Sequence, residues 1–240
     1  MSTLLVSVLL PTRNRTELVA RSVQSLLSRC SDASRIEIIV AFDQDDVASQ
    51  QYFESKRWSH VIASAGAHSQ QLVCEPWGYA GLHRYYTAMA RQAQGSWFMI
   101  WNDDAIMQST GWDQAIADEK DFVGMLHMHT ANFKPNLTLF PIIPKAWMDL
   151  FGEISLHQLN DSWIQDICHE ADAVCRLPVT VFHDRYDVTG NNGDETYVNR
   201  RYDKKLYNHE SMRQIRSNWA TRLREYRQHI GVGEPRLDPT

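Results

Sequence analysis

The first half of the chain contains three apolar runs that are continuous rather than alternating. They cover Val6–Leu10, Ile36–Ala41 and Trp97–Trp101. An unbroken apolar run is typical of a strand that is buried on both faces, as the strands of a parallel sheet are. Each run is followed by polar residues, and acidic clusters follow the second and third. The pattern therefore predicts neighbouring strands whose carboxyl ends carry polar side chains.

Between these strands the apolar residues follow helical spacing. One stripe runs from Leu18 to Leu27, behind Thr16 as a candidate N-cap, and another runs through Gly81–Gln94. A further short strand is expected around Val61–Ala63. The resulting order of strands and helices predicts a doubly wound α/β sheet, whose ligands bind beyond the carboxyl ends of the strands.

The second half of the chain is less regular but continues the α/β pattern. The elements predicted there are strands over Phe122–Met128, Leu137–Ile143 and Val179–Phe182, and helices over Trp112–Ala117, from Pro144 onwards, over Asp161–Asp172 and over roughly 209–228. The expected architecture is a single domain. A mostly parallel sheet is flanked by helices, and a helical segment follows at the C-terminus.

Composition and cysteine usage narrow the class of protein. Of the 240 residues, 43% are apolar and 22% are charged, which is typical of a globular domain. No apolar run approaches the roughly 18–20 residues that a membrane span needs, and the first run lacks the flanks of a signal peptide. The four cysteines form no CxxC pair and are interpreted as free thiols of a reduced, cytoplasmic protein: Cys30, Cys74, Cys168 and Cys175.

The net charge of −5 hides a basic segment near the C-terminus. Residues 200–229 carry nine Lys and Arg against three Asp and Glu, a net charge of +6, so the rest of the chain carries −11. Two interpretations stay open. The segment contacts a polyanion, or its arginine stems lie along a helix and pair with acidic neighbours on the body.

The acids that close the third apolar run are the strongest candidates for chemistry. Asp103 and Asp104 follow the strand directly, after Asn102. Neighbouring carboxylates repel each other unless a cation lies between them. Mg²⁺ and Mn²⁺ prefer such oxygen ligands and keep room for substrate phosphates. The alternative is a turn in which Asn and Asp cap a helix.

Two other strand ends bring polar groups to the same edge of the sheet. Asp43 closes the second run, where its carboxylate can accept hydrogen bonds from a nucleobase or a ribose. Pro11, Thr12, Arg13 and Arg15 follow the first run. They supply a turn and two cations that can contact a diphosphate.

Together these segments resemble the GT-A type of nucleotide-sugar glycosyltransferase, in particular the large inverting family 2. Val6–Arg15 is similar to the first strand and turn of that family, and Ile38–Asp43 is similar to its second strand. Gly95–Asp104 is similar to the stretch that ends in the DxD metal motif, and the resemblance covers residues 4–107. The chain departs from the family at Phe42 and Gln44, which replace an acid and a glycine, and at Asn102, which stands at the first Asp of DxD.

The resemblance implies a GT-A-like, Rossmann-related fold and transfer of a sugar from a nucleoside-diphosphate sugar to an acceptor hydroxyl, with inversion. It assigns Mn²⁺ or Mg²⁺ to Asp104, with Asp103 next and His183 as a third ligand, although a lone histidine is also explained as a structural hydrogen-bonding group. The other residues expected to contact the donor are Pro11, Thr12, Arg13, Arg15, Asp43 and Asn102. The family's general base lies near the start of a helix, which points to Asp161, with Asp166 as the alternative and an N-cap as the competing interpretation of Asp161.

The resemblance also divides the chain into a nucleotide-sugar-binding half, residues 1–125, an acceptor-binding half, residues 126–199, and the basic segment 200–240. The Gly/Asn-rich stretch Asp187–Glu195 is interpreted as a flexible lid. The acceptor stays open between a hydroxymethylpyrimidine in DNA, as in some bacteriophages, and a surface glycan. Two other classes remain: a nucleotidyltransferase, which the absence of glycine from Pro11–Arg15 disfavours, and a non-catalytic module that binds sugar nucleotides.

Overall fold

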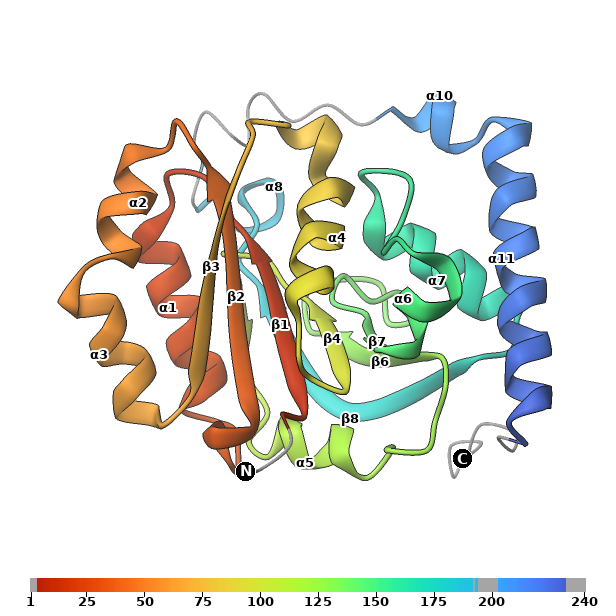
Figure 1. Ribbon diagram of the computed structural model, residues 1–240, viewed down its shortest axis with the longest axis horizontal. Coiled ribbons are helices and arrows are strands. Elements are labelled where there is room, and N and C mark those ends of the chain that lie inside the picture. The colour runs from red at the N-terminus through yellow and green to blue at the C-terminus, as the bar shows by residue number, and fades with distance from the viewer. Residues whose placement is uncertain (1–3, 192, 194–202, 232–240) are drawn as a thin grey trace.

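The computed structural model describes residues 4–191, 193 and 203–231. The described strands form one eight-stranded sheet in the order β3-β2-β1-β4-β7-β6-β8-β5 (Figure 1). The strands are β1 (Val6–Pro11), β2 (Ile36–Asp43), β3 (His68–Cys74), β4 (Trp97–Ile100), β5 (Ala105–Met107), β6 (Met125–Thr130), β7 (Ile142–Pro144) and β8 (Val174–His183). The expected α/β class is confirmed.

Helices cover the sheet on both sides (Figure 1). They are α1 (Thr16–Leu27), α2 (Val47–Phe53), α3 (Lys56–Ala65), α4 (Leu82–Gln92), α5 (Trp112–Ala117), α6 (Ala146–Phe151), α7 (Asn160–Glu170), α8 (Tyr186–Thr189), α10 (Lys204–Tyr207) and α11 (Glu210–His229). Apolar side chains of α1, α2, α3 and α5 pack on one face of the sheet. Those of α4, α6, α7 and α11 pack on the other, so the domain has three layers.

The parallel part of the sheet is built from the continuous apolar runs. Val8 of β1 pairs with Ile38 of β2 and with Met99 of β4, and all three side chains are fully buried. Since β1, β2 and β4 are parallel, their carboxyl ends lie at one edge of the sheet. Beyond β4 the sheet becomes mixed: β7 is antiparallel to β4, while β6 and β8 are parallel to each other.

The strand predicted around Val61–Ala63 is wrong, because these residues lie in α3. Ser55 caps that helix by accepting a hydrogen bond from the Trp58 backbone, and Gly66 ends it in the left-handed conformation with φ 76°. The strand that follows β2 in the sheet is β3, at the edge. Most of its residues are polar, so it lacks the apolar run on which the prediction depended.

Other boundaries differ for local reasons. β8 begins before the predicted strand and continues through Pro178, and its pairing with β6 shifts register nearby, between His127 and His129. The strand predicted over Leu137–Ile143 is reduced to β7, and the three-residue strand β5 was not predicted. The N-cap predicted at Thr16 is also wrong, since Thr16 is the first residue of α1.

Gly95 allows the close approach of β1 to the start of β4. Its amide donates to the Ser7 hydroxyl at 2.9 Å, and a β-carbon on Gly95 would lie 2.6 Å from the Ser7 backbone nitrogen. We expect Gly95→Ala to lower the free energy of unfolding by about 1–3 kcal/mol, because backbone atoms must move apart. Urea unfolding measures this change. The exposed neighbour Ser96 is the control, since Ser96→Ala should change stability by less than about 0.5 kcal/mol; equal stability of Gly95→Ala and wild type would contradict the packing argument.

Candidate functional site

A pocket of about 410 Å³ opens at the carboxyl ends of β1, β2 and β4. It is lined by segments from both halves of the chain. The residues that the sequence predicted as donor contacts and metal ligands, and the first of the two candidate bases, all line this pocket: Pro11, Thr12, Arg13, Arg15, Asp43, Asn102, Asp103, Asp104, Asp161 and His183. The topology of the sheet therefore brings together these ten residues, although they are spread over more than 170 positions of sequence.

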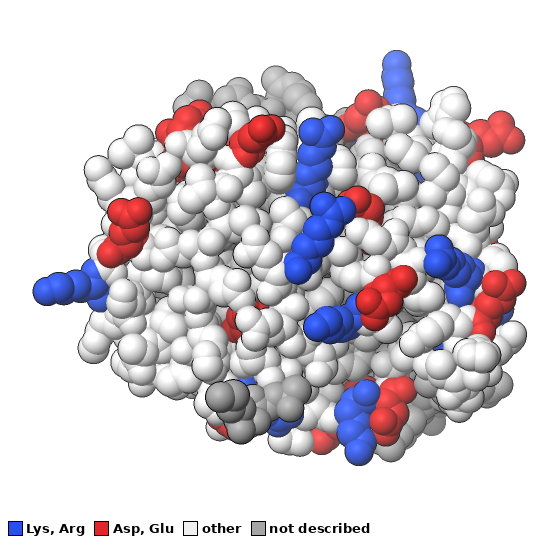
Figure 2. Space-filling model, in the orientation of Figure 1, with Lys and Arg blue, Asp and Glu red and all other residues white. Residues whose placement is uncertain are grey.

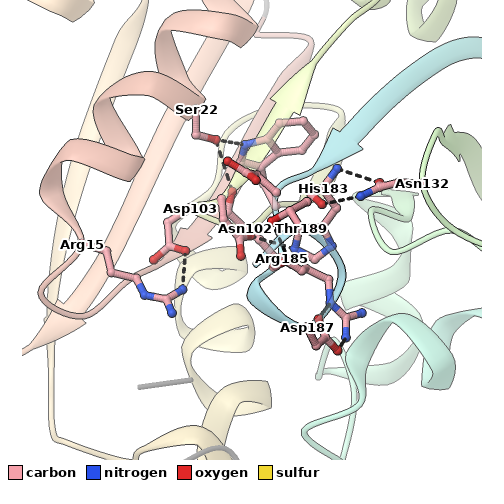
Figure 3. Close-up of polar contacts among 12 residues, drawn as sticks. Arg15, Ser22, Asn102, Asp103, Asn132, His183, Arg185, Asp187 and Thr189 are labelled. Atoms are coloured by element: carbon pink, nitrogen blue, oxygen red, sulfur yellow. Dashed lines mark hydrogen bonds and ion pairs between the residues drawn. The ribbon is translucent and has the colours of Figure 1, made fainter. Parts of the chain in front are cut away.

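Asp103 links the end of β4 to the turn after β1. One carboxylate oxygen accepts a hydrogen bond from the Thr12 hydroxyl at 2.8 Å. The other pairs with the Arg15 guanidinium at 3.1 Å, as Figure 3 shows. Burial raises the pKa of Asp103 to about 6, and the charge of Arg15 opposes that rise. Both oxygens thus have protein partners. The contact holds the Arg15 guanidinium at the pocket wall.

Asp104 contacts His183, which arrives from the end of β8. Its Oδ1 lies 2.7 Å from Nε2 of His183, and both side chains are nearly buried. Although burial favours the neutral acid, the hydrogen bond and charge of His183 hold the pKa of Asp104 below its usual value. Asp104 is therefore ionised near neutral pH.

The surroundings of His183 fix its ring. The side-chain amide of Asn132 both donates to the His183 carbonyl and accepts from its amide, at 2.7 and 3.1 Å (Figure 3). The ring packs edge-on against Phe140 with a centroid distance of 5.0 Å. Asn102 approaches from the other side, with its Nδ2 3.3 Å from His183 Nε2. The nitrogen that faces Asp104 is thus held in place.

The described residues contain no group of three His, Cys, Asp or Glu side chains that could hold a metal ion by themselves. The Asp104–His183 pair offers two ligand atoms. Its 2.7 Å N···O separation is similar to the ~2.9 Å between adjacent ligand atoms of an octahedral ion with ~2.1 Å bonds. Mg²⁺ typically takes one or two carboxylates and completes its shell with water and substrate phosphates. The pair fits an ion of that kind and does not fit a closed, all-protein site.

Asp43 joins the end of β2 to two other segments at the pocket. Its Oδ1 accepts a hydrogen bond from the Tyr85 hydroxyl of α4, and its Oδ2 pairs with Arg13 at 2.6 Å. Arg13 also bonds to Asp45 at 2.6 Å. The acid is 3% exposed, so the charge of Arg13 offsets its burial. The result is an arginine oriented at the pocket rim by two acids.

The two candidate bases on α7 lie in different surroundings. Asp161, in the first turn, lines the pocket, and burial raises its pKa. It is not the N-cap, because α7 begins at Asn160. Asp166 does not line the pocket and accepts instead from the Tyr207 hydroxyl at 2.6 Å, with Arg216 Nε at 3.1 Å. Of the two acids, Asp161 therefore lines the pocket and Asp166 does not.

Several lining residues were missed by the sequence analysis. They are Gly78, Tyr79, Leu82, Tyr85, Tyr86, Ile100, Phe133, Leu139, Gln158, Leu159, Asn160, Ser162, Arg185 and Lys204. Tyr85 and Tyr86 lie in the apolar stripe predicted through Gly81–Gln94, and both pack in the core, but their hydroxyls also reach the strand ends. The sequence signal for this role was that both tyrosines lie near the start of a helix that precedes a strand of the sheet.

Arg185 follows His183 and extends into the site from the stretch predicted as a lid. Its guanidinium bonds to Asp187, and its carbonyl accepts from the Thr189 hydroxyl at 2.9 Å (Figure 3). Residues 186–189 form the short helix α8 instead of a loop. Residues 192, 194 and 195 of the predicted lid lie outside the described residues.

Two arginines of the basic C-terminal segment are buried by packing, whereas Lys204, Lys205, Arg213 and Arg222 are exposed. Arg216 is 5% exposed, and its guanidinium lies 4.1 Å from the Tyr207 ring centroid. Arg227 is 7% exposed and donates to the Asp172 carbonyl at 2.6 Å. Acidic and basic side chains are interspersed on the face seen in Figure 2. The interpretation that arginine stems lie along the helix holds for these two arginines, while residues 200–202 lie outside the described residues. Among the helices that the structure describes, none is long and apolar enough to cross a membrane.

Comparisons with known proteins place the fold. No protein-family profile matches the chain, and no curated protein matches it. Solved structures do match, but at low sequence identity. S. aureus TarS 1–349 in complex with UDP is 16% identical, with a TM-score of 0.51 over 76% of this chain and 59% of that one. The chain thus spans less than two thirds of that structure.

Two further matches cover nearly the whole chain. The mannosyltransferase PcManGT from Pyrobaculum calidifontis, in complex with GDP-Man and Mn²⁺, is 12% identical, with a TM-score of 0.59 over 95% of this chain and 75% of that one. TarS 1–349 in complex with UDP-GlcNAc is 14% identical, with a TM-score of 0.58 over 96% of this chain and 76% of that one. The chain therefore has the fold of the GT-A glycosyltransferases.

Proposed function

We propose that the protein transfers a sugar from a nucleoside-diphosphate sugar to an acceptor hydroxyl, with inversion of the anomeric carbon. The observation that carries this proposal is the pocket, in which the ends of three parallel strands gather acids and cations on a GT-A fold. The neighbours' ligands support it, since TarS was solved with UDP and with UDP-GlcNAc and the mannosyltransferase with GDP-Man. An α/β sheet binds such ligands beyond the carboxyl ends of its strands.

The donor would lie across the ends of β1, β2 and β4. Asp43 and Arg13 form the rim nearest β2, where their fixed hydrogen-bonding groups suit a base or ribose. Arg15 directs a guanidinium held by Asp103 toward the diphosphate. Pro11, Thr12 and Asn102 supply the remaining wall. Because these groups are already paired and oriented, little reorganisation is needed when the donor binds.

We further propose a Mn²⁺ or Mg²⁺ ion held by Asp104 and His183, with Asp103 beside them. When bound, such an ion supplies positive charge that stabilises the diphosphate as a leaving group. The lowered pKa of Asp104 keeps its carboxylate ionised for this task. Arg15, paired with the adjacent Asp103, adds a second positive charge. The Mn²⁺ of the mannosyltransferase neighbour supports the choice of metal.

Asp161 is the proposed general base. No side chain of the described residues hydrogen-bonds to its carboxylate, which lines the pocket from the acceptor-side segment of α7. Burial raises its pKa, which makes it a stronger base than an exposed aspartate. Its carboxylate would accept the proton of the acceptor hydroxyl as that oxygen attacks the anomeric carbon on the face opposite the diphosphate.

The identity of the acceptor remains between a hydroxymethylpyrimidine in DNA and a surface glycan. A cytoplasmic location in a bacterial or phage-infected cell also remains part of the proposal. The four free cysteines support it, because they are what a reducing compartment maintains.

Donor binding can be tested before any acceptor is known. We expect at least one of UDP-GlcNAc, GDP-Man and related sugar nucleotides to raise the melting temperature more with Mn²⁺ than without it. A ligand at 100 times its Kd stabilises by about 2.7 kcal/mol. Asp104→Asn should remove the Mn²⁺-dependent part of this shift, whereas Asp118→Asn, an exposed acid outside the pocket, should keep it. A Mn²⁺-dependent shift retained in full by Asp104→Asn would refute the ligand assignment.

The role of Asp161 is tested by turnover of the donor identified in this way. Asp161→Asn should reduce transfer by roughly 10²–10⁴-fold, since the proton loses its acceptor, while the donor-induced melting shift stays. Asp166→Asn keeps an acceptor oxygen for Tyr207 and lies outside the pocket, so its turnover should stay within a few-fold of wild type. If Asp166→Asn loses transfer and Asp161→Asn keeps it, the two assignments are reversed.

The raised pKa of Asp161 has consequences for activity and stability with opposite signs. Activity should fall on the acid side at a pH above the ~3.9 of an ordinary aspartate, because the base must be ionised. Folded protein binds this proton more tightly than unfolded protein, so the group's contribution to stability is lost as pH rises through the folded pKa. Asp161→Asn should therefore be at least as stable as wild type at pH 7, measured by melting temperature. A variant clearly less stable at pH 7 would contradict the desolvation argument.

A further inference from the structure

The charged side chains that line the pocket are almost all paired with an opposite charge. The pairs are Arg13 with Asp43, Arg15 with Asp103, His183 with Asp104, and Arg185 with Asp187. Two lining groups, Asp161 and Lys204, form no ion pair with any residue that the structure describes. Asp161 is accounted for as the base. Lys204 is then the lining cation whose charge is still available to a ligand.

The position of Lys204 is fixed by the short helix α10, of which it is the first residue. Asp203 caps this helix by accepting a hydrogen bond from the Leu206 amide at 2.8 Å. The Asp203 carbonyl lies 3.0 Å from Nε2 of His157, in the segment that leads to α7. The lysine is exposed, but the backbone that carries it is held against the acceptor-side wall of the pocket.

Tyr207 anchors the other end of α10. Its side chain is 8% exposed, and its hydroxyl donates to Asp166 of α7 at 2.6 Å. The Tyr207 carbonyl accepts from Arg216 at 3.0 Å, and the same guanidinium covers its ring. α10 is thus attached to the helix that carries Asp161. Lys204 and Asp161, which form no ion pair with a described residue, are thus carried by two helices that contact each other.

We propose that the acceptor carries an anionic group, a phosphate or a carboxylate, near the hydroxyl that reacts, and that Lys204 binds it. This inference rests on the proposed function. The diphosphate of the donor has Arg15 at the strand ends, whereas Lys204 lies on the support of the base. A lysine binds an anion as a mobile point charge, which suits an acceptor whose position varies more than that of the donor.

The neighbouring Lys205 provides a matched control. It lies on the same exposed helix, one residue further along, and does not line the pocket. Any general effect of a positive charge on α10 would be shared by both lysines. A specific effect of Lys204 would therefore appear as a difference between Lys204→Gln and Lys205→Gln.

The test uses acceptors that differ by one charged group, with the donor identified by thermal shift. Glycerol 3-phosphate is compared with glycerol, and glucuronate with glucose; the two pairs distinguish a phosphate from a carboxylate. We expect wild type to use one anionic member with kcat/KM about 10- to 100-fold higher, through a lower acceptor KM. Lys204→Gln should abolish this preference and leave the donor KM unchanged, whereas Lys205→Gln should behave as wild type. Added salt should weaken the preference in wild type.

Each result decides the proposal. Equal use of charged and neutral acceptors by wild type would overturn it, as would equal effects of the two lysine substitutions. A rise in donor KM in Lys204→Gln, with acceptor KM unchanged, would overturn it by assigning the lysine to the diphosphate. If wild type neither hydrolyses nor transfers any sugar nucleotide and shows no thermal shift, the proposed function itself has failed, an outcome distinct from transfer without preference.

Discussion

Carboxylates buried at the ends of strands need opposite charges, and this requirement shapes the site. Asp43, Asp103 and Asp104 are each less than 10% exposed. A charge removed from water is costly unless an ion pair and hydrogen bonds compensate it. The partners come from segments distant in the sequence: the turn after β1 supplies the arginines, and β8 supplies His183. The ion pairs that offset the cost of burying these acids thus also fix the relative positions of β1, β2, β4 and β8.

The same requirement gives a reason for Asn102 at the position where the family resemblance expects an acid. Its Oδ1 lies 3.2 Å from the Tyr86 hydroxyl, and its Nδ2 faces His183 at 3.3 Å. An amide can be a donor and an acceptor at once, which a carboxylate cannot. A third carboxylate next to Asp103 and Asp104 would add negative charge where Arg15 and His183 are already paired with those two acids. The substitution therefore preserves hydrogen bonding and limits the uncompensated charge.

The parts of the molecule that could be predicted from the sequence are those in which burial produces a recognisable apolar pattern. β1, β2 and β4 are buried on both faces, so each is an unbroken apolar run, and their ends locate the site through topology alone. The edge strand β3 is half exposed and has no unbroken apolar run. Tyr85 and Lys204 could not be assigned either. A tyrosine in a helical stripe has the same pattern whether or not its hydroxyl reaches an acid, and a lysine on a surface helix looks alike wherever that helix lies.

Asp161 differs from the other acids of the pocket because it forms no ion pair with a described residue, and burial outweighs the charges of Arg185 and His183 in raising its pKa. The paired acids have a structural role, since each joins two elements of the fold. Asp161 joins none, and its burial favours the neutral form, so the ionised group costs stability. Stability alone would be served as well by an amide at this position. A buried carboxylate that opposes folding and forms no ion pair with a described residue, at the wall of a pocket, is consistent with the general-base role proposed for it.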